Sequence, residues 1–407
     1  MVLLAVACVL LKAGLCGAAE SPEYEIRLET LLEHDDGRYL WFHPRVASVP
    51  GAGQDGGPAV ILTLQRHLRT SDHYSGLYFM RTDDMCRTWT EPQLPPGLDW
   101  VRDGDVDIAV ADVTPGYHPA TGKVIAMGAQ VRYSATGEQL EDVPGAHQTA
   151  YAIYDPTAGT WTRWERLAMP DEPDFNMARN ACSQWWVEPD GTLLVPLYHG
   201  ASASAPARVT VARYAFDGAR MAYIERGNTL TQDEVRGLAE PSLTRYGTRY
   251  YLTVRHDLRG YVSTSEDGLH YSPLQPWTFD DGTELGSYNT QQHWVTHAQG
   301  LFLTYTRSGA DNDHIMRHRA PLFIAQVNPE RLCVIRATER VLVPERGATL
   351  GNFGAAQVSP TESWVTVSEG VWDDAARQRG ATGATFVARI VWAVVNPLYN
   401  WGLPGTR

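Results

Sequence analysis

The stretch LTVRHDLRGYVSTSEDGLHYS, residues Leu252–Ser272, contains two features that together indicate how the chain folds. It begins as a hydrophobic strand that carries Arg255 at its end, and it finishes with SEDGLHY, residues Ser265–Tyr271. In such a turn the Ser and Asp side chains bond turn amides and the glycine accepts a left-handed backbone. The closing aromatic ring holds the turn against its sheet. A chain that repeats this pattern is built from many short hairpins.

Two related turns occur elsewhere in the chain. TDDMCRTW, residues Thr82–Trp89, fits the pattern Ser/Thr-x-Asp-x-Gly-x-Thr-Trp, with Cys86 in place of the glycine. DPTAGTW, residues Asp155–Trp161, keeps the acid, the glycine and the terminal Trp. Turns of this kind are called Asp boxes and lie on the outer rim of a sheet. We therefore assign them a structural role and not a catalytic one.

Short runs of β-branched, aromatic and aliphatic residues separate these turns, and helical periodicity is nearly absent. Examples are AVILTLQR, KVIAMGAQVRY, TLLVPLY, RVTVARYAF and GLFLTYTR. The strands are too many for one sandwich, and the helices are too few for an α/β domain. Regular short strands over such a length favour radial repetition. The sequence predicts an all-β chain that forms a six-bladed β-propeller, as a single domain over residues 22–407.

Charge and composition exclude one class of partner and favour another. The 407 residues include 34 Lys and Arg against 47 Asp and Glu, and a formal charge of -13 argues against a nucleic-acid surface. The 13 Trp and 19 Tyr outnumber the 9 Phe, an excess of polar-tipped aromatic residues that suits a protein that stacks sugars. We expect a glycan or glycoconjugate partner and a monomeric protein.

The first twenty residues, MVLLAVACVLLKAGLCGAAE, are typical of a secretory signal with cleavage after Ala19. No basic residue precedes the apolar run, and Lys12 interrupts it. No later run is long enough to span a bilayer. We predict a signal peptide over residues 1–19 and a secreted or periplasmic mature chain.

The remaining cysteines and the histidines give no sign of a metal or cofactor. Cys86, Cys182 and Cys333 are odd in number and lack C-x-x-C spacing, so they predict neither a disulfide framework nor a zinc site. His293 and His297 would share one face of a strand but lie too far apart for one ion. No phosphate-binding loop or nucleophile elbow is present. We expect no metal and no cofactor.

Because it contains Asp-box turns, the chain resembles the sialidase (neuraminidase) superfamily of six-bladed propellers. The resemblance extends from Arg45 to about Glu369. Members carry Arg-Ile-Pro or a variant near the first blade, where WFHPRVASVP offers Arg45. The family then places an acid in a loop just before a strand and the first Asp box, where this chain has Asp72. A later block of Glu-Pro, Arg and an Asp box is matched by Glu240 and Arg255.

The third arginine of the family precedes a hydrophobic strand, and RHRAPLFIAQV offers Arg319, with Arg317 as a close competitor. Three converging guanidinium groups form a multidentate clamp for a carboxylate. The resemblance implies that Asp72 is the acid and base at the glycosidic oxygen and that Glu240 is a general base near the anomeric carbon. It implies an exo-glycosidase that removes terminal acidic sugars, with sialic acid as the first candidate.

One position departs from the family, in which a tyrosine of the last blade is the nucleophile. The segment GATLGNFGAAQVSP has Asn352 and Phe353 at that place, and Tyr288 is an alternative that we include among the substrate-binding residues. Water could attack directly with Glu240 as base, Tyr288 could act from another blade, or the substrate could be another acidic glycan, such as a uronate, for a hydrolase or lyase. A non-catalytic glycan-binding propeller is the remaining alternative. Asp112, which resembles a motif that begins a blade, reads as structural.

Overall fold

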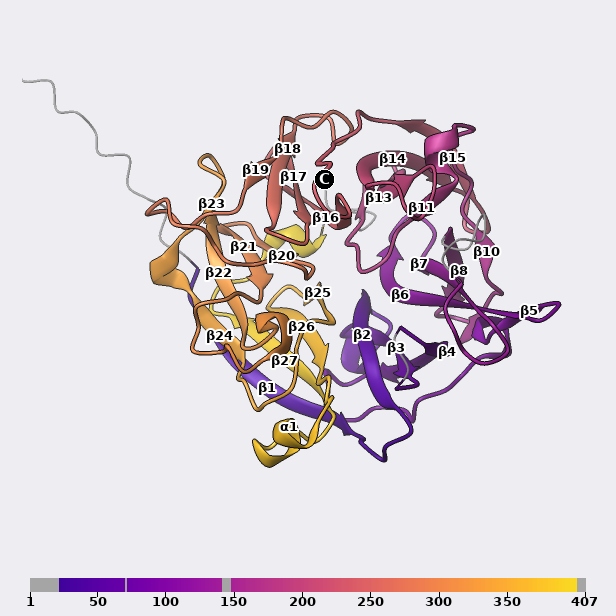
Figure 1. The fold of residues 1–407 in the computed structure, drawn as a ribbon, viewed down its shortest axis with the longest axis horizontal. Coiled ribbons are helices and arrows are strands. Elements are labelled where there is room, and N and C mark those ends of the chain that lie inside the picture. The colour runs from indigo at the N-terminus through magenta and orange to yellow at the C-terminus, as the bar shows by residue number, and fades with distance from the viewer. Residues whose placement is uncertain (1–21, 70–71, 141–147, 401–407) are drawn as a thin grey trace, which may run out of the picture.

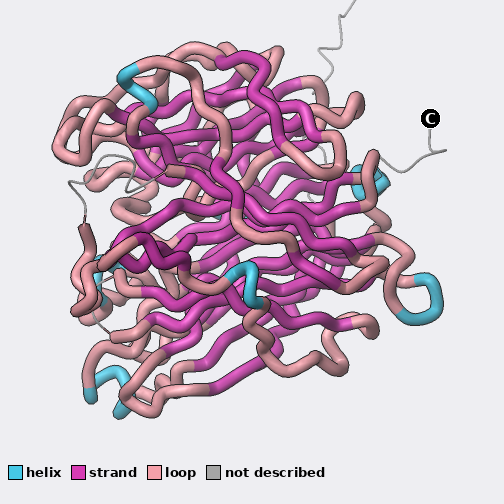
Figure 2. Tube along the Cα trace, turned by 90° about the vertical axis from the view of Figure 1, so that its right-hand side faces the viewer, coloured by secondary structure: helices cyan, strands magenta, loops and turns pink. Residues whose placement is uncertain are grey.

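The computed structural model describes residues 22–69, 72–140 and 148–400, and in these ranges it confirms the six-bladed β-propeller. Six sheets surround a central axis, and the chain passes through them in order (Figure 1). A view turned by 90° shows that most strands run through the thickness of the molecule, along this axis (Figure 2). The proposed signal peptide lies outside the described residues. No described helix is long and apolar enough to cross a membrane.

We number the blades in chain order. Blade 1 contains β2 (Leu40–Val49), β3 (Ala59–His67) and β4 (Tyr74–Thr82). Blade 2 contains β5 (Val101–Asp103), β6 (Val106–His118), β7 (Lys123–Tyr133), β8 (Thr149–Asp155), β9 (Thr160–Trp161) and β10 (Glu165–Arg166). Blade 3 contains β11 (Met177–Arg179), β12 (Trp186–Val187), β13 (Leu193–Gly200), β14 (Arg208–Phe216) and β15 (Met221–Arg226).

The second half of the chain completes the ring. Blade 4 contains β16 (Ala239–Tyr246), β17 (Arg249–Arg255), β18 (Tyr261–Ser265) and β19 (Gln275–Pro276). Blade 5 contains β20 (His293–His297), β21 (Gly300–Tyr305), β22 (Leu322–Asn328), β23 (Cys333–Val334) and β24 (Arg340–Val343). Blade 6 contains β25 (Phe353–Ser359), β26 (Glu362–Ser368), β27 (Ala384–Trp392) and, from the start of the chain, β1 (Tyr24–Glu33).

Helices are few and short in the described residues. They are the helix α1 (Asp374–Gln378) and the 3-10 turns η1 (Gln54–Gly56), η2 (Pro96–Leu98), η3 (Pro173–Phe175), η4 (Met316–His318), η5 (Arg336–Thr338) and η6 (Pro397–Asn400). The α-helix begins after Asp373, whose side chain accepts a hydrogen bond from the amide of Ala376 and so satisfies a free donor of the first turn.

The hydrophobic core lies between neighbouring blades. Leu252 and Val254 of β17 share a buried cluster with Val209 and Val211 of β14, so blade 4 packs on blade 3. A similar cluster joins blade 5 to blade 6. Burial of apolar side chains on both faces of each sheet stabilises the ring by the hydrophobic effect. This packing fixes the inner strands of all blades around one axis.

The quoted turn after β18 is held by its own side chains. The Ser265 hydroxyl bonds Asp267, and Asp267 Oδ1 accepts hydrogen bonds from the amides of Leu269 and His270 at 2.9 and 2.8 Å. The turn after β4 has a similar arrangement, in which Asp84 accepts from the Thr88 amide and hydroxyl. In both turns polar side chains replace the backbone hydrogen bonds that the chain loses on leaving the sheet.

Candidate active site

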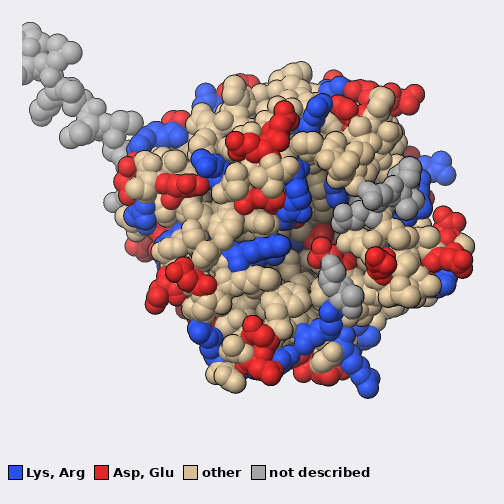
Figure 3. All heavy atoms as spheres, in the orientation of Figure 1, with Lys and Arg blue, Asp and Glu red and all other residues tan. Residues whose placement is uncertain are grey.

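A cavity of about 480 Å³ lies at one end of the propeller axis. Figure 3 shows a hollow near the centre of this face, with basic and acidic side chains gathered at its rim. Its charged and aromatic lining residues are His43, Asp72, Tyr74, Asp112, Arg179, Tyr198, Arg236, Glu240, Arg255, His256, Asp257, Arg317 and Arg319. The lining thus contains five arginines and four carboxylates, and the charge that the cavity presents depends on which of them form ion pairs.

The inner part of each of the first four blades turns a side chain toward the cavity through an unusual backbone. His43, Asp112, Cys182 and Glu240 all line it, and all have left-handed φ angles, between 44° and 57°. The strand pairing of β2, β6 and β16 is interrupted at His43, Asp112 and Glu240, respectively. A bulge of this kind re-aims side chains, and a left-handed backbone costs energy in residues other than glycine. The fold therefore carries backbone strain around this cavity.

Two of the predicted arginines meet on one side of the cavity. Arg255, at the end of β17, forms an ion pair with Glu240 and donates to the Asn289 side-chain oxygen at 2.6 Å. Arg319 donates to the backbone carbonyl of the same Asn289. Burial and the nearby charge of Arg255 lower the pKa of Arg319 to about 10. Two cations held this close favour an anion between them.

Two further arginines add positive charge: Arg179, which the sequence did not single out, and Arg317, which it gave as the competitor of Arg319. Arg179 lies 4.7 Å from the centre of the Tyr198 ring, to which it is paired across β11 and β13. Arg317 has a left-handed φ of 56° in η4 and also lines the cavity. Within the described residues, no ion pair engages Arg179, Arg317 or Arg319. The cations of this cavity therefore exceed the carboxylates that pair with them.

The opposite side of the cavity, on blades 1 and 2, is acidic. Asp72 lies in the loop before β4, where its Oδ1 accepts a hydrogen bond from the Tyr74 hydroxyl at 3.2 Å. Tyr133 donates to its backbone carbonyl at 2.8 Å. Burial, followed by the nearby charge of Asp72, raises the pKa of Tyr74, so its hydroxyl stays protonated and remains a donor. These contacts orient an exposed carboxylate at the cavity rim.

Asp112 also lies in the cavity, although we interpreted it from the sequence as structural. Its Oδ1 is 2.8 Å from His43 Nε2 and accepts from the Cys182 thiol at 2.9 Å. Burial opposes ionisation, but the charge and hydrogen bond of His43 hold the pKa of Asp112 well below its usual range. Burial and the charge of Asp112 raise the pKa of the Cys182 thiol, so Cys182 stays protonated. Asp112 is thus a charged anchor that links three blades.

Arg45 lies deeper than predicted. It is fully buried, does not line the cavity, and donates to the Val113 carbonyl at 3.4 Å. Its charge contributes to the lowered pKa of Asp112, after the effects of burial and His43. A Cβ on Gly354 would lie 2.5 Å from Arg45 Cγ, so the backbone of blade 6 presses directly on this side chain.

The segment where a tyrosine was expected presents an amide. Asn352 lines the cavity, whereas the Phe353 side chain is buried and its carbonyl accepts hydrogen bonds from Gln291 and His293 at 3.0 Å. Tyr288 is not among the described residues that line the cavity, and its hydroxyl lies 2.7 Å from His318 Nδ1. Tyr198 lines the cavity, but burial raises the pKa of its hydroxyl group.

Four of the six predicted site residues therefore line one cavity: Asp72, Glu240, Arg255 and Arg319. Arg45 lies beneath it and Tyr288 beside it. Arg179 and Tyr198 were missed; Arg179 ends β11 as Arg255 ends β17, a pattern that could have identified it, whereas Tyr198 lies within β13 and carries no such signal. Among the residues that the structure describes, no cluster of three or more His, Cys, Asp or Glu could hold a metal ion.

Comparison with known proteins shows that this chain is similar in fold to several solved structures. No protein-family model matches the chain, and no curated protein matches its sequence. The NanB sialidase from Streptococcus pneumoniae superposes with a TM-score of 0.61 at 11% identity, over 91% of this chain and 71% of that one. The leech intramolecular trans-sialidase gives 0.57 at 12% identity, over 90% and 70%.

A third solved structure has a different named activity. The α-L-arabinofuranosidase from Fusarium graminearum superposes with a TM-score of 0.55 at 12% identity, over 90% of this chain and 98% of that one. The chain thus shares the sialidase-type propeller, a scaffold that also serves a glycosidase named for a neutral sugar. The fold alone therefore does not determine a substrate.

Proposed function

We propose that this protein is a glycoside hydrolase that removes a terminal acidic sugar from a glycan, with sialic acid as the first candidate. The division of charge across the cavity carries the proposal. Arg179, Arg255 and Arg319 come from the consecutive blades 3, 4 and 5, whereas Asp72 and Asp112 come from blades 1 and 2. A sugar with a carboxylate on one side and a scissile bond on the other fits this polarity.

The carboxylate would bind between Arg255 and Arg319. Both guanidinium groups are fixed through Asn289, and no ion pair neutralises Arg319 among the described side chains. The two N–H groups of a guanidinium match the two oxygens of a carboxylate, and the electrostatic attraction between them is stronger in a partly buried site than in water. Arg179 and Arg317 would extend this positive side. Arg45 would act from below, through Asp112 and the cavity floor.

Asp72 would exchange a proton with the glycosidic oxygen. It is the exposed carboxylate at the acidic rim, and the Tyr74 hydroxyl holds its orientation. Glu240 would act as general base on the other side of the bond. One of its oxygens pairs with Arg255, and Oε2 has no hydrogen-bond partner in the described structure, which leaves it free to accept a proton.

Direct attack by water is the mechanism that fits best, because neither Tyr288 nor Tyr198 is suited to act as the nucleophile. Asn352 offers no nucleophilic oxygen, Tyr288 is bonded to His318, and burial raises the pKa of Tyr198 and so disfavours its phenolate. A single displacement by water inverts the configuration at the anomeric carbon. We therefore infer an inverting exo-glycosidase. Export and a single-domain mature chain remain predictions from the sequence.

The test is the release of free sugar from sialylated, uronate-containing and arabinose-containing glycans, with Asp72→Asn as the inactive control. Proton NMR of the first product anomer distinguishes inversion from retention. Release of a uronate would change the substrate, and glycan binding without release would make the propeller a binding protein. Release of only neutral sugar would contradict the assignment of the arginines to a carboxylate.

A further inference from the structure

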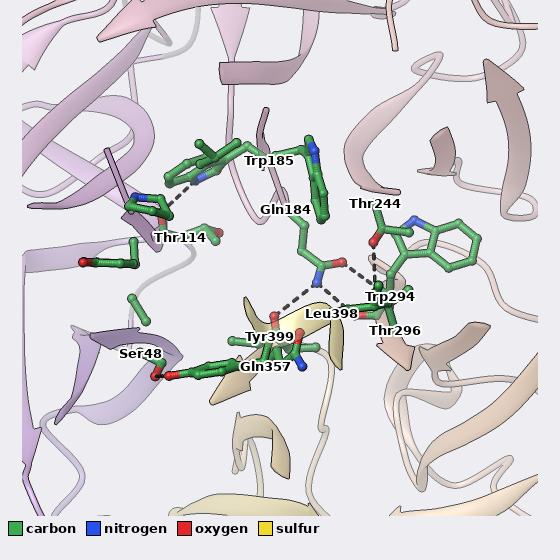
Figure 4. A pocket seen from close by; sticks show the side chains of 18 of the residues that line it. Ser48, Thr114, Gln184, Trp185, Thr244, Trp294, Thr296, Gln357, Leu398 and Tyr399 are labelled. Atoms are coloured by element: carbon green, nitrogen blue, oxygen red, sulfur yellow. Dashed lines mark hydrogen bonds between the residues drawn. The ribbon is translucent and has the colours of Figure 1, made fainter. Parts of the chain in front are cut away.

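A second cavity, of about 310 Å³, lies at the other end of the propeller axis (Figure 4). The inner strands contribute residues to both cavities. A residue that lines the charged cavity is followed, a few positions later on the same strand, by a residue that lines the second cavity. In blade 2, Asp112 lines the first cavity and Thr114 the second, and in blade 4 the corresponding residues are Glu240 and Thr244. The two cavities are therefore opposite mouths of the same ring of strands.

A layer of hydrogen-bonded side chains separates the two mouths. Gln184 donates to the carbonyls of Trp294 and Ala355 at 3.0 and 3.1 Å and accepts from the Trp294 amide at 2.7 Å. His293 bonds Ser242 and the Phe353 carbonyl in the same layer. These bonds tie blades 3, 4, 5 and 6 together across the axis, so the second cavity is a site of its own.

Charged side chains line the first cavity, whereas the second is lined mostly by aromatic and uncharged side chains. Its walls include Tyr117, Trp185, Trp186, Trp294 and Tyr399. Its one charged residue in the described lining is Glu188, whose carboxylate already accepts from the Tyr250 hydroxyl at 2.7 Å. A ligand here meets aromatic faces and no free charge.

Three polar atoms of this lining have no hydrogen-bond partner in the described structure. They are Thr114 Oγ1, Trp186 Nε1 and Gln357 Nε2. Figure 4 shows Thr114 and Gln357 on different sides of the cavity, with Trp185 and Tyr399 nearby. These atoms are themselves buried in the cavity wall. Buried donors without partners are costly, and a side chain that turns into the cavity relieves that cost by donating to a ligand with acceptor oxygens.

We propose that this second cavity binds a neutral saccharide. A sugar ring offers an apolar face to stack on indole and phenol rings, and it carries hydroxyl oxygens around its edge for donors such as Thr114 and Gln357. A charged sugar would find no counter-ion here. The site is separate from the proposed hydrolytic centre and does not depend on it. It would hold the neutral part of a glycan while the charged cavity acts on another branch or molecule.

The experiment titrates galactose, N-acetylglucosamine and lactose into the full chain and follows intrinsic tryptophan fluorescence together with ligand-observed NMR. The variant Thr114→Val combined with Gln357→Leu removes two unpartnered donors at nearly constant volume. We expect wild-type protein to bind at least one of the three sugars and the double variant to bind it about tenfold more weakly or worse. Its melting temperature should be unchanged or higher, because no existing hydrogen bond is removed.

Asp72→Asn, in the charged cavity, is the matched control, and it should bind the same neutral sugar as well as wild type does. The single variants Thr114→Val and Gln357→Leu provide the readout if the double variant fails to fold. Absence of binding by all three sugars would overturn the proposal. Binding that survives in the double variant but is lost in Asp72→Asn would also overturn it, since the sugar would then occupy the charged cavity.

Discussion

Glu240 combines a strained backbone with a charge that Arg255 partly neutralises. Its φ of 44° at the bulge of β16 turns the carboxylate into the cavity, where a regular strand would turn it elsewhere. Strain at such a position persists only when the surrounding packing enforces it. The side chain is then fixed before substrate arrives, which lowers the cost of organising the site.

Glu240→Gln tests this role at the scale of one residue. The amide keeps the size of the side chain but can neither accept a proton nor pair fully with Arg255. We expect kcat to fall by roughly 10²- to 10⁴-fold, the usual contribution of a general base. Measured kcat and KM on the substrate identified above provide the check. A fall of less than fivefold would remove Glu240 from the chemistry.

Gly351→Ala tests the position of Arg319. A Cβ on Gly351 would lie 2.5 Å from Arg319 Cδ, so the arginine must move. We expect KM for the acidic substrate to rise about tenfold, since one of two carboxylate-binding groups is displaced. Gly200→Ala is the matched control, because the nearest atom to its Cβ would be 3.5 Å away, an ordinary contact. Equal KM values for the two variants would contradict the role of Arg319.

At the scale of one element, the turn after β4 departs from its pattern at Cys86. Cys86 has a left-handed φ of 77°, the conformation that glycine adopts in the comparable turn at Gly268. Its sulfur also accepts from the Trp89 indole at 3.4 Å. The turn therefore keeps its hydrogen bonds while one residue is strained.

Cys86→Gly should stabilise the protein by about 0.5–1 kcal/mol, because glycine relieves the left-handed strain. Cys86→Ala removes the same sulfur contact but keeps a Cβ at the same φ, so it should be neutral or destabilising. Urea unfolding of both variants provides the comparison. A lower free energy of unfolding for Cys86→Gly than for Cys86→Ala would contradict the strain argument, because both variants lack the sulfur contact and differ only in the Cβ.

The elements themselves were predictable from the sequence, whereas the bulges were not. Alternating apolar runs and turn residues indicate strands and hairpins through local chemistry, and their regular recurrence along the chain predicted a propeller of six blades. A bulge changes which side chains face the axis, and nothing in one sequence marks where it occurs. For this reason Asp112 was interpreted as structural, and Arg45 was placed in the cavity when it lies below it. Arg255, at the end of the regular strand β17, lines the cavity.

At the scale of the whole molecule, the polar layer on the axis responds to acid. His293 is buried between blades, where Nε2 lies 3.0 Å from the Phe353 carbonyl and Nδ1 lies 2.9 Å from the Ser242 hydroxyl. A carbonyl only accepts, so Nε2 carries the proton and Nδ1 accepts from Ser242. Burial, followed by the charge of Arg45, lowers the pKa of His293 to about 3.

This pKa predicts a loss of stability in acid. Below the ordinary value of 6.5 the unfolded chain binds a proton at His293 that the folded chain refuses until about pH 3. The stabilising contribution is therefore complete above pH 6.5 and falls as the pH decreases. At a pH two units below the ordinary value, the loss of stability relative to neutral pH amounts to about 2–3 kcal/mol.

His293→Gln isolates this effect, because glutamine can donate to Phe353 and accept from Ser242 without titrating. Urea unfolding at neutral and at mildly acidic pH should show a smaller loss for the variant than for wild type. Equal losses would show that His293 does not contribute to the acid sensitivity.

The ring is closed by its two ends, since β1 pairs along its length with β27, from Tyr24 opposite Trp392 to Glu33 opposite Ala384. During synthesis β1 is therefore made before every other strand of the propeller and finds its partner last. Blade 6 cannot be completed until the final strand has been made. An early stop anywhere before β27 would leave both an open ring and an unpaired edge strand. The ring thus closes only after synthesis has passed β27.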